Sequence, residues 1–205
     1  HLAVADSLLH NPHRKQTDLA DVAHSASAWH GDLFALEDEK AARDVLHRQY
    51  AAVVGNPPYI VVQDSALRES YRRLYTSCHR NYSLAVPFCE RFFQLARSRG
   101  YVGQITANSF MKRDFGKKLI EDYLPGVNLE LIVNTSGAYI PGHGTPTVLL
   151  FGTHEPAQAP EVAAVLSKRG EPSTPPNPSK GQVWSSIAAH WSTTGFEDEY
   201  VSVAR

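Results

Sequence analysis

Residues 50–59, YAAVVGNPPY, decide how this chain is expected to fold. An apolar run that contains β-branched residues and ends at a Gly-Asn-Pro-Pro sequence predicts a buried strand, at residues 51–54, that stops abruptly at a turn. Because proline fixes φ and has no N–H group, the two prolines make the loop after this strand stiff. In α/β proteins, ligands bind at the carboxyl ends of parallel strands. The residues from Asn56 to Tyr59 are therefore the first candidate site.

These residues suit chemistry at a planar amine. The N6 amine of adenine is a poor nucleophile because its lone pair is delocalised, and two hydrogen-bond acceptors would draw the nitrogen toward a tetrahedral geometry. The Asn56 side-chain oxygen and the Pro57 carbonyl oxygen are two such acceptors, both neutral dipoles that are fixed in advance. Pro58 keeps the loop stiff, and the ring of Tyr59 offers a flat face for an extruded base. Transfer from a methyl sulfonium donor would then need no metal. A plain proline turn is the alternative interpretation.

Composition limits the classes of protein to consider. The 205 residues include 20 Lys and Arg against 21 Asp and Glu, so no global basic field indicates nucleic-acid binding. Any contact with DNA must use local patches or other parts of the protein. The two cysteines, Cys78 and Cys89, suggest neither a metal cluster nor a disulfide framework, and no apolar stretch is long enough to span a membrane. These features are typical of a globular cytosolic protein.

Strands and helices are expected to alternate along the chain. Helices are predicted at residues 37–49, 65–75, 83–98 and 114–124, with Gly100 ending the third, and strands at residues 51–54, 101–106, 129–134 and 147–151. This order is typical of an α/β protein with a parallel doubly wound sheet. We expect the last two strands to form an antiparallel hairpin at the edge of that sheet.

Several segments occur together in the order known from one family of enzymes. Residues 56–59 resemble motif IV of amino-group DNA methyltransferases. The other matching segments are HGDLF (30–34, the acidic turn at the donor's adenosine), YSLAVPF (82–88, motif V), GQITANSF (103–110, motif VI) and AYIPGHGTPTV (138–148, the hairpin near the target base). The order resembles that of adenine-N6 enzymes. The runs CHRNYS (78–83) and GHGTPT (142–147) are similar to the phage-defence methyltransferases of type 2 BREX, or phage-growth-limitation, systems, and the resemblance covers about residues 30–152.

The resemblance implies a Rossmann-like fold, S-adenosyl-L-methionine as co-substrate without a metal, and the N6 amine of adenine in DNA as acceptor. It implies double-stranded DNA with a flipped adenine as partner, other phage-defence proteins as further partners, and a bacterial cytoplasm. By the same resemblance, the residues from Asn56 to Tyr59 are catalytic, Asp32 and Phe88 contact the donor, and Tyr139 contacts the target base. The predicted divisions are residues 1–29, part of a donor-binding half; 30–152, the catalytic region; and 153–205, a linker and the start of a following region.

Several of these assignments have plainer alternatives. Asp32 also suits a helix N-cap, Phe88 shares a helix face typical of the core, and Tyr139 also suits an ordinary hairpin position. A cluster after motif VI could contact phosphates or simply face solvent: Lys112, Arg113, Lys117 and Lys118.

The function also has open alternatives. The same chemistry could act on guanine N2 in RNA or on a protein glutamine, and a non-catalytic DNA-binding subunit could retain the fold. The chain starts at His1 and shows no glycine-rich donor loop before its first strand. We therefore expect it to be a fragment whose donor loop lies upstream, and expect these 205 residues alone to be inactive.

Overall fold

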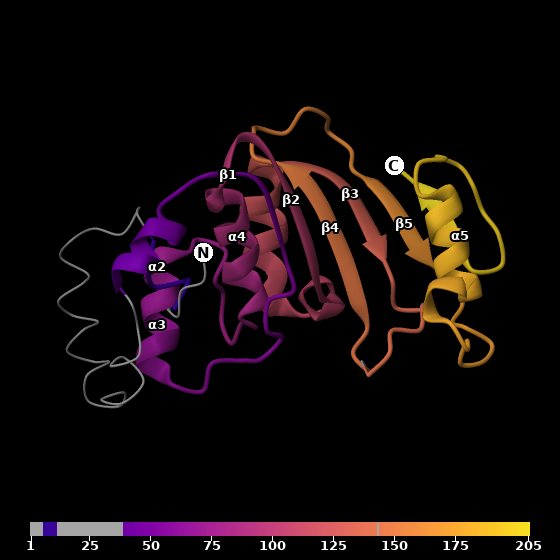
Figure 1. Ribbon diagram of the computed structural model, residues 1–205, viewed down its shortest axis with the longest axis horizontal. Coiled ribbons are helices and arrows are strands. Elements are labelled where there is room, and N and C mark those ends of the chain that lie inside the picture. The colour runs from indigo at the N-terminus through magenta and orange to yellow at the C-terminus, as the bar shows by residue number, and fades with distance from the viewer. Residues whose placement is uncertain (1–5, 12–38, 143) are drawn as a thin grey trace.

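A computed structural model describes residues 6–11, 39–142 and 144–205, and within them a single six-stranded sheet organises the chain (Figure 1). The strand order is β1-β2-β4-β3-β5-β6. The strands are β1 (Tyr50–Gly55), β2 (Ala96–Ala107), β3 (Asn128–Asn134), β4 (Thr147–Thr153), β5 (Ala163–Ser167) and β6 (Val201–Ala204). The pairs β1–β2 and β3–β5 are parallel, whereas β4 is antiparallel to both neighbours and β6 is antiparallel to β5. The predicted α/β class is confirmed, with a mixed sheet.

The helices are α2 (Glu39–Leu46), α3 (Ser65–Leu74), α4 (Ala85–Leu95) and α5 (Gln182–His190). The start of α3 is fixed by Asp64, whose side chain accepts a hydrogen bond from the Leu67 N–H group and so satisfies one free donor of the first turn. The helix predicted at residues 114–124 is an irregular helical segment that combines 3-10 turns with a π turn at Leu119–Tyr123. None of the helices in the described part of the chain is long and apolar enough to cross a membrane.

Two apolar cores pack against the sheet, and the central strand β3 contributes a buried residue to each. The larger one is built around α4, where Val86, Cys89 and Phe93 are buried together with residues of β2 and β4. The smaller one lies under α5 and joins Val133, Val165, Val183, Ile187, Val201 and Val203. Figure 1 shows α4 near β1 and β2, and α5 beside β5 at the other end. Strands from residues 153–205 thus continue the same sheet, while the predicted division at residue 152 stays a prediction.

The burial predicted for the first strand is wrong. β1 forms where it was expected, but within the described residues it lies at the edge of the sheet and pairs with β2 alone. Its side chains are largely uncovered, and Val54 is 80% exposed. An apolar run indicates that a strand can be buried on both faces. Whether it is buried depends on other segments that pack against those faces, and a local pattern does not reveal them.

The helix predicted to end at Gly100 ends instead at Leu95, and β2 begins at once with Ala96. Ala96 is extended because it pairs with Tyr50 of β1, so tertiary pairing overrides the local helical pattern. Gly100 belongs to the strand, where a Cβ atom would approach the carbonyl oxygens of Arg97 and Tyr50 to 2.8 Å. The predicted hairpin of β3 and β4 is antiparallel, but it lies inside the sheet because β4 inserts next to β2 and β5 extends the other side.

Candidate active site at the carboxyl end of β1

The motif loop, residues 56–62, leaves the carboxyl end of β1 and is anchored through its backbone. The Ile60 carbonyl accepts a hydrogen bond from the Leu84 N–H group at 2.9 Å, and Val61 forms an antiparallel bridge with Ser83. Pro57 is buried, so the loop is also held by packing. The structure therefore brings the predicted motif IV directly against the predicted motif V segment at residues 82–88.

The functional side chains of the motif loop differ in exposure. Asn56 is exposed and Tyr59 is half-buried. The Tyr59 hydroxyl donates a hydrogen bond to Oδ1 of Asn56 at 2.5 Å. Burial raises the pKa of Tyr59, which favours the protonated phenol that this hydrogen bond requires. Two of the residues that the sequence singled out are thus hydrogen-bonded to each other in this structure.

An aromatic pair lies beneath the loop. A Cβ atom added at Gly55 would come within 2.6 Å of Cζ of Phe92, so the glycine allows that ring to lie against the end of β1. Phe88 meets Phe92 edge to face with ring centroids 6.1 Å apart, a favourable aromatic geometry. Phe88 is half-buried, and its contact with the donor stays a prediction.

Gln104 is a polar neighbour of the site that the sequence reasoning did not single out. It pairs with Gly55 across β1 and β2 and is only 2% exposed. Its Nε2 donates to the Ala85 carbonyl at 3.3 Å, while its Oε1 has no partner among the described residues. The sequence feature that could have pointed to Gln104 is a glutamine among apolar strand residues. Buried polar groups usually have a hydrogen-bond partner, so such a residue calls for an explanation.

Tyr139 lies in the β3–β4 connection, at the same edge of the sheet as the motif loop. The strand directions require this, because β1, β2 and β3 run in the same sense and end at one edge. Asn108 links the segment after β2 to this connection, since its N–H group donates to Pro146 and its Nδ2 donates to Ser136 Oγ at 2.8 Å. Tyr139 is 37% exposed. Asp32 lies outside the described residues.

The charged residues after β2 are solvent-facing. The four basic side chains of this cluster are all exposed: Lys112, Arg113, Lys117 and Lys118. Lys117 lies 3.8 Å from Glu121, and Arg80 lies 2.6 Å from Asp114. Their contact with phosphates stays a prediction. Within the described part of the chain, no group of three or more His, Cys, Asp or Glu residues is arranged to hold a metal ion.

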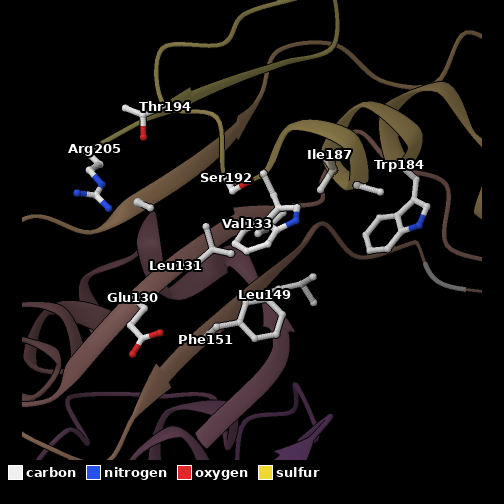
Figure 2. Close-up of a pocket in the computed structure, with 13 residues that line it drawn as sticks. Glu130, Leu131, Val133, Leu149, Phe151, Trp184, Ile187, Ser192, Thr194 and Arg205 are labelled. Atoms are coloured by element: carbon white, nitrogen blue, oxygen red, sulfur yellow. The ribbon is translucent and has the colours of Figure 1, made fainter.

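A separate cavity of about 650 Å³ lies between α5 and the sheet (Figure 2). Its lining is mainly apolar and comes from β3, β4, α5 and the residue that caps the end of α5: Leu131, Val133, Leu149, Phe151, Trp184, Ile187 and Trp191. Figure 2 shows Glu130 and Arg205 on the side of the cavity away from Trp184. The motif loop follows β1 at the far edge of the sheet, so this cavity is distinct from the candidate active site. The sequence did not predict it, because its walls come from segments far apart along the chain.

Comparisons with known proteins identify relatives of this chain. The model of the Eco57I restriction-modification methylase family matches residues 5–140, more than half of the chain. The adenine-specific methyltransferase PglX of Streptomyces coelicolor is 43% identical over 99% of this chain, and the type II restriction enzyme and methyltransferase RM.Eco57I of Escherichia coli is 33% identical over 37%. The chain spans 18% and 8% of the lengths of these two relatives.

Among the solved structures with a similar fold is a protein from a restriction system. It is a modification subunit of a putative type I restriction enzyme from Vibrio vulnificus, with a TM-score of 0.55 and 13% sequence identity. The match covers 77% of this chain and 34% of that protein. At this level of identity the likeness shows the fold alone.

Proposed function

Because this chain belongs to the Eco57I restriction-modification methylase family, we propose that its protein transfers a methyl group from S-adenosyl-L-methionine to the N6 amine of adenine in double-stranded DNA. The observation that carries the proposal is the position of Asn56. Its side chain is exposed on a stiff, anchored loop at the carboxyl end of β1, where α/β proteins bind ligands. The name of the PglX relative, adenine-specific methyltransferase, supports adenine as the acceptor.

Asn56 and Pro57 act on the amine that is to be methylated. The Asn56 Oδ1 atom and the Pro57 carbonyl accept the two N–H groups, which favours a tetrahedral nitrogen and localises its lone pair. Both acceptors are fixed dipoles that stabilise positive charge developing on nitrogen, so they act mainly in the transition state. Pro57 is buried and Pro58 has a fixed φ, so the loop pays little conformational entropy to hold this geometry.

Aromatic residues receive the base after it leaves the duplex. The half-buried ring of Tyr59 stacks on the flipped adenine, and Tyr139, at the same edge of the sheet, contacts the edge of the base. The exposed cluster after β2 contacts phosphates through Lys112 and Arg113. Both aromatic and basic residues at this edge of the sheet thus have proposed roles in holding DNA.

The described residues fit the adenosine side of the donor. Phe88 and Phe92 form a half-buried aromatic surface beneath the motif loop, and such a surface suits a purine ring. Asp32 is proposed to hydrogen-bond the donor's adenine. When bound, the donor supplies the methyl group as a sulfonium, and no metal is required. We place this reaction in a bacterial phage-defence or restriction-modification system in the cytoplasm, with other defence proteins as partners.

The test is the substitution Asn56→Ala in the whole protein. We expect methyl transfer to fall by about two orders of magnitude or more, with donor binding nearly unchanged, because the lost acceptor acts on the transition state. Transfer of labelled methyl groups to DNA measures the rate, and nucleoside analysis identifies N6-methyladenine. Asn177→Ala is the control, since Asn177 is an exposed asparagine that caps a turn before α5.

Three outcomes would contradict the proposal. Near-normal transfer by Asn56→Ala would show that Asn56 does not accept the amine. Label in RNA guanine or in a protein glutamine, with none in DNA, would favour the alternative acceptors. A wild-type protein that binds DNA but transfers no methyl group would instead be a non-catalytic subunit.

A further inference from the structure

The Tyr59 hydroxyl occupies the acceptor that the proposed reaction needs. It donates to Asn56 Oδ1 at 2.5 Å, at the short end of the usual range for O–H···O hydrogen bonds. The Tyr59 ring alone would be sufficient for stacking on a base, so the stacking role does not explain this hydrogen bond. Asn56 is exposed, and its amide would otherwise rotate freely and present either its oxygen or its nitrogen.

We propose that the Tyr59 hydroxyl is a stand-in for the adenine amine: it holds Asn56 Oδ1 in position before the base arrives and is displaced when the amine binds. This inference rests on the proposed function and adds a second role to Tyr59, that of a positioning residue. No bond is made or broken in the step, because one N–H donor replaces one O–H donor on the same oxygen.

The loop is built to keep the two groups together. Two prolines separate Asn56 from Tyr59. Because the φ angles of the prolines are fixed, the backbone limits how far the side chains of Asn56 and Tyr59 can move apart. The backbone beyond Tyr59 is anchored by the hydrogen bond from Leu84 to Ile60. The hydroxyl and the oxygen therefore meet without folding of any further segment, and only side-chain rotation is needed to separate them.

The exchange has a measurable consequence. In the wild-type protein the amine must displace an existing donor, so part of its hydrogen-bond energy is lost. In Tyr59→Phe the ring remains, but the acceptor is free. The net contribution of one neutral hydrogen bond corresponds to roughly a threefold to tenfold change in an equilibrium constant. The amine should therefore contribute more to binding in the variant, by about that factor.

The experiment compares two target bases in two proteins. The recognition site is first identified by sequencing DNA that the whole protein has methylated. Duplexes are then made with either adenine or purine at the target position, since purine lacks only the 6-amino group. Their dissociation constants are measured with S-adenosyl-L-homocysteine present, so that no methyl group can be transferred. The preference for adenine over purine should rise about threefold to tenfold in Tyr59→Phe, while affinity for the purine duplex stays the same.

Tyr101→Phe is the matched control, because it removes the hydroxyl group of another tyrosine, an exposed one on β2. We expect it to leave the preference unchanged. An unchanged or reduced preference in Tyr59→Phe would overturn the stand-in role.

Asn56→Ala separates this result from the proposed function. Loss of the adenine preference in Asn56→Ala, with no change in Tyr59→Phe, would refute only the stand-in. An undiminished preference in Asn56→Ala would refute Asn56 as the acceptor itself.

Discussion

Replacing Arg91 with methionine is expected to release residues 6–11 from α4. Arg91 is 1% exposed, and its guanidinium donates to three backbone carbonyls. Its Nε donates to Ser7 at 3.2 Å, and its Nη2 donates to His10 at 2.8 Å and to Leu46 at 2.7 Å. Burial lowers the pKa of Arg91, which reflects the cost of holding its charge away from water. One side chain thus fastens two separate segments to the helix that supports the motif loop.

The magnitude follows from what methionine leaves behind. Methionine fills much of the apolar volume but donates no hydrogen bond, so three carbonyls lose a charged donor, each loss costing about 1–3 kcal/mol if the group stays buried. Removal of the buried charge returns part of this energy, because arginine no longer has to be dehydrated. The balance predicts that the free energy of unfolding falls by about 2–4 kcal/mol.

Urea unfolding measures the free energy, and hydrogen exchange of residues 6–11 measures their release. Arg97→Met is the control, because Arg97 is an exposed arginine on the neighbouring strand β2 and should change stability by less than about 0.5 kcal/mol. A loss below about 1 kcal/mol in Arg91→Met, with unchanged exchange at residues 6–11, would refute the account of Arg91 as a clamp.

Two further predictions concern single groups. Gly116→Ala should lower the free energy of unfolding by about 1–3 kcal/mol in urea, because its Cβ atom would lie 1.9 Å from the Phe110 carbonyl oxygen, whereas Gly126→Ala, with open space around it, should be nearly neutral. Burial tends to raise the pKa of Asp198, but hydrogen bonds from Ser186 and from two backbone N–H groups lower it overall. The ionised Asp198 carboxylate therefore stabilises the fold above about pH 4, and this contribution is lost as the pH falls through the lowered pKa. Asp198→Asn should make the free energy of unfolding depend less on pH in the acid range. An unchanged acid profile would contradict this prediction.

Elements with strong local signals could be predicted from the sequence. The helix expected at residues 65–75 forms as α3, and its first turn is capped by Asp64. The strand expected at residues 129–134 forms as β3 after the Pro125-Gly126 stop. In both cases the deciding interactions join residues close together in the sequence, so pattern and capping chemistry are enough.

Features that depend on distant partners could not be predicted. Ala96 looks like the last turn of a helix, but pairing with Tyr50 makes it a strand residue. The hairpin lies inside the sheet because β5 finds its partner in β3, across a long connection. Likewise, a buried Arg91 on an amphipathic helix gives no local indication of which carbonyls it will meet. Tertiary pairing decides each of these cases, and local propensity is only a weak prior.

The candidate site was more predictable than its surroundings, because the motif encodes chemistry and backbone geometry together. Asn56 and Tyr59 were identified from residue types and spacing, but their mutual hydrogen bond was not, since it depends on side-chain rotation that the sequence does not specify. Gln104 was missed because its place beside the site is set by the tertiary structure. Its significance comes only from pairing with Gly55 and from its burial.

Besides the packing of Pro57, two backbone contacts anchor the motif loop. The contacts that fix it are the hydrogen bond from Leu84 to Ile60 and the bridge between Val61 and Ser83. Neither backbone contact involves the side chain of Asn56 or Tyr59, so we expect both contacts to remain when either side chain is replaced. Substitution at these two residues should therefore change the free energy of unfolding by no more than about 1 kcal/mol. Loss of methyl transfer or a shift in base preference can then be attributed to the site, and a larger loss of stability would show that the side chains also hold the loop.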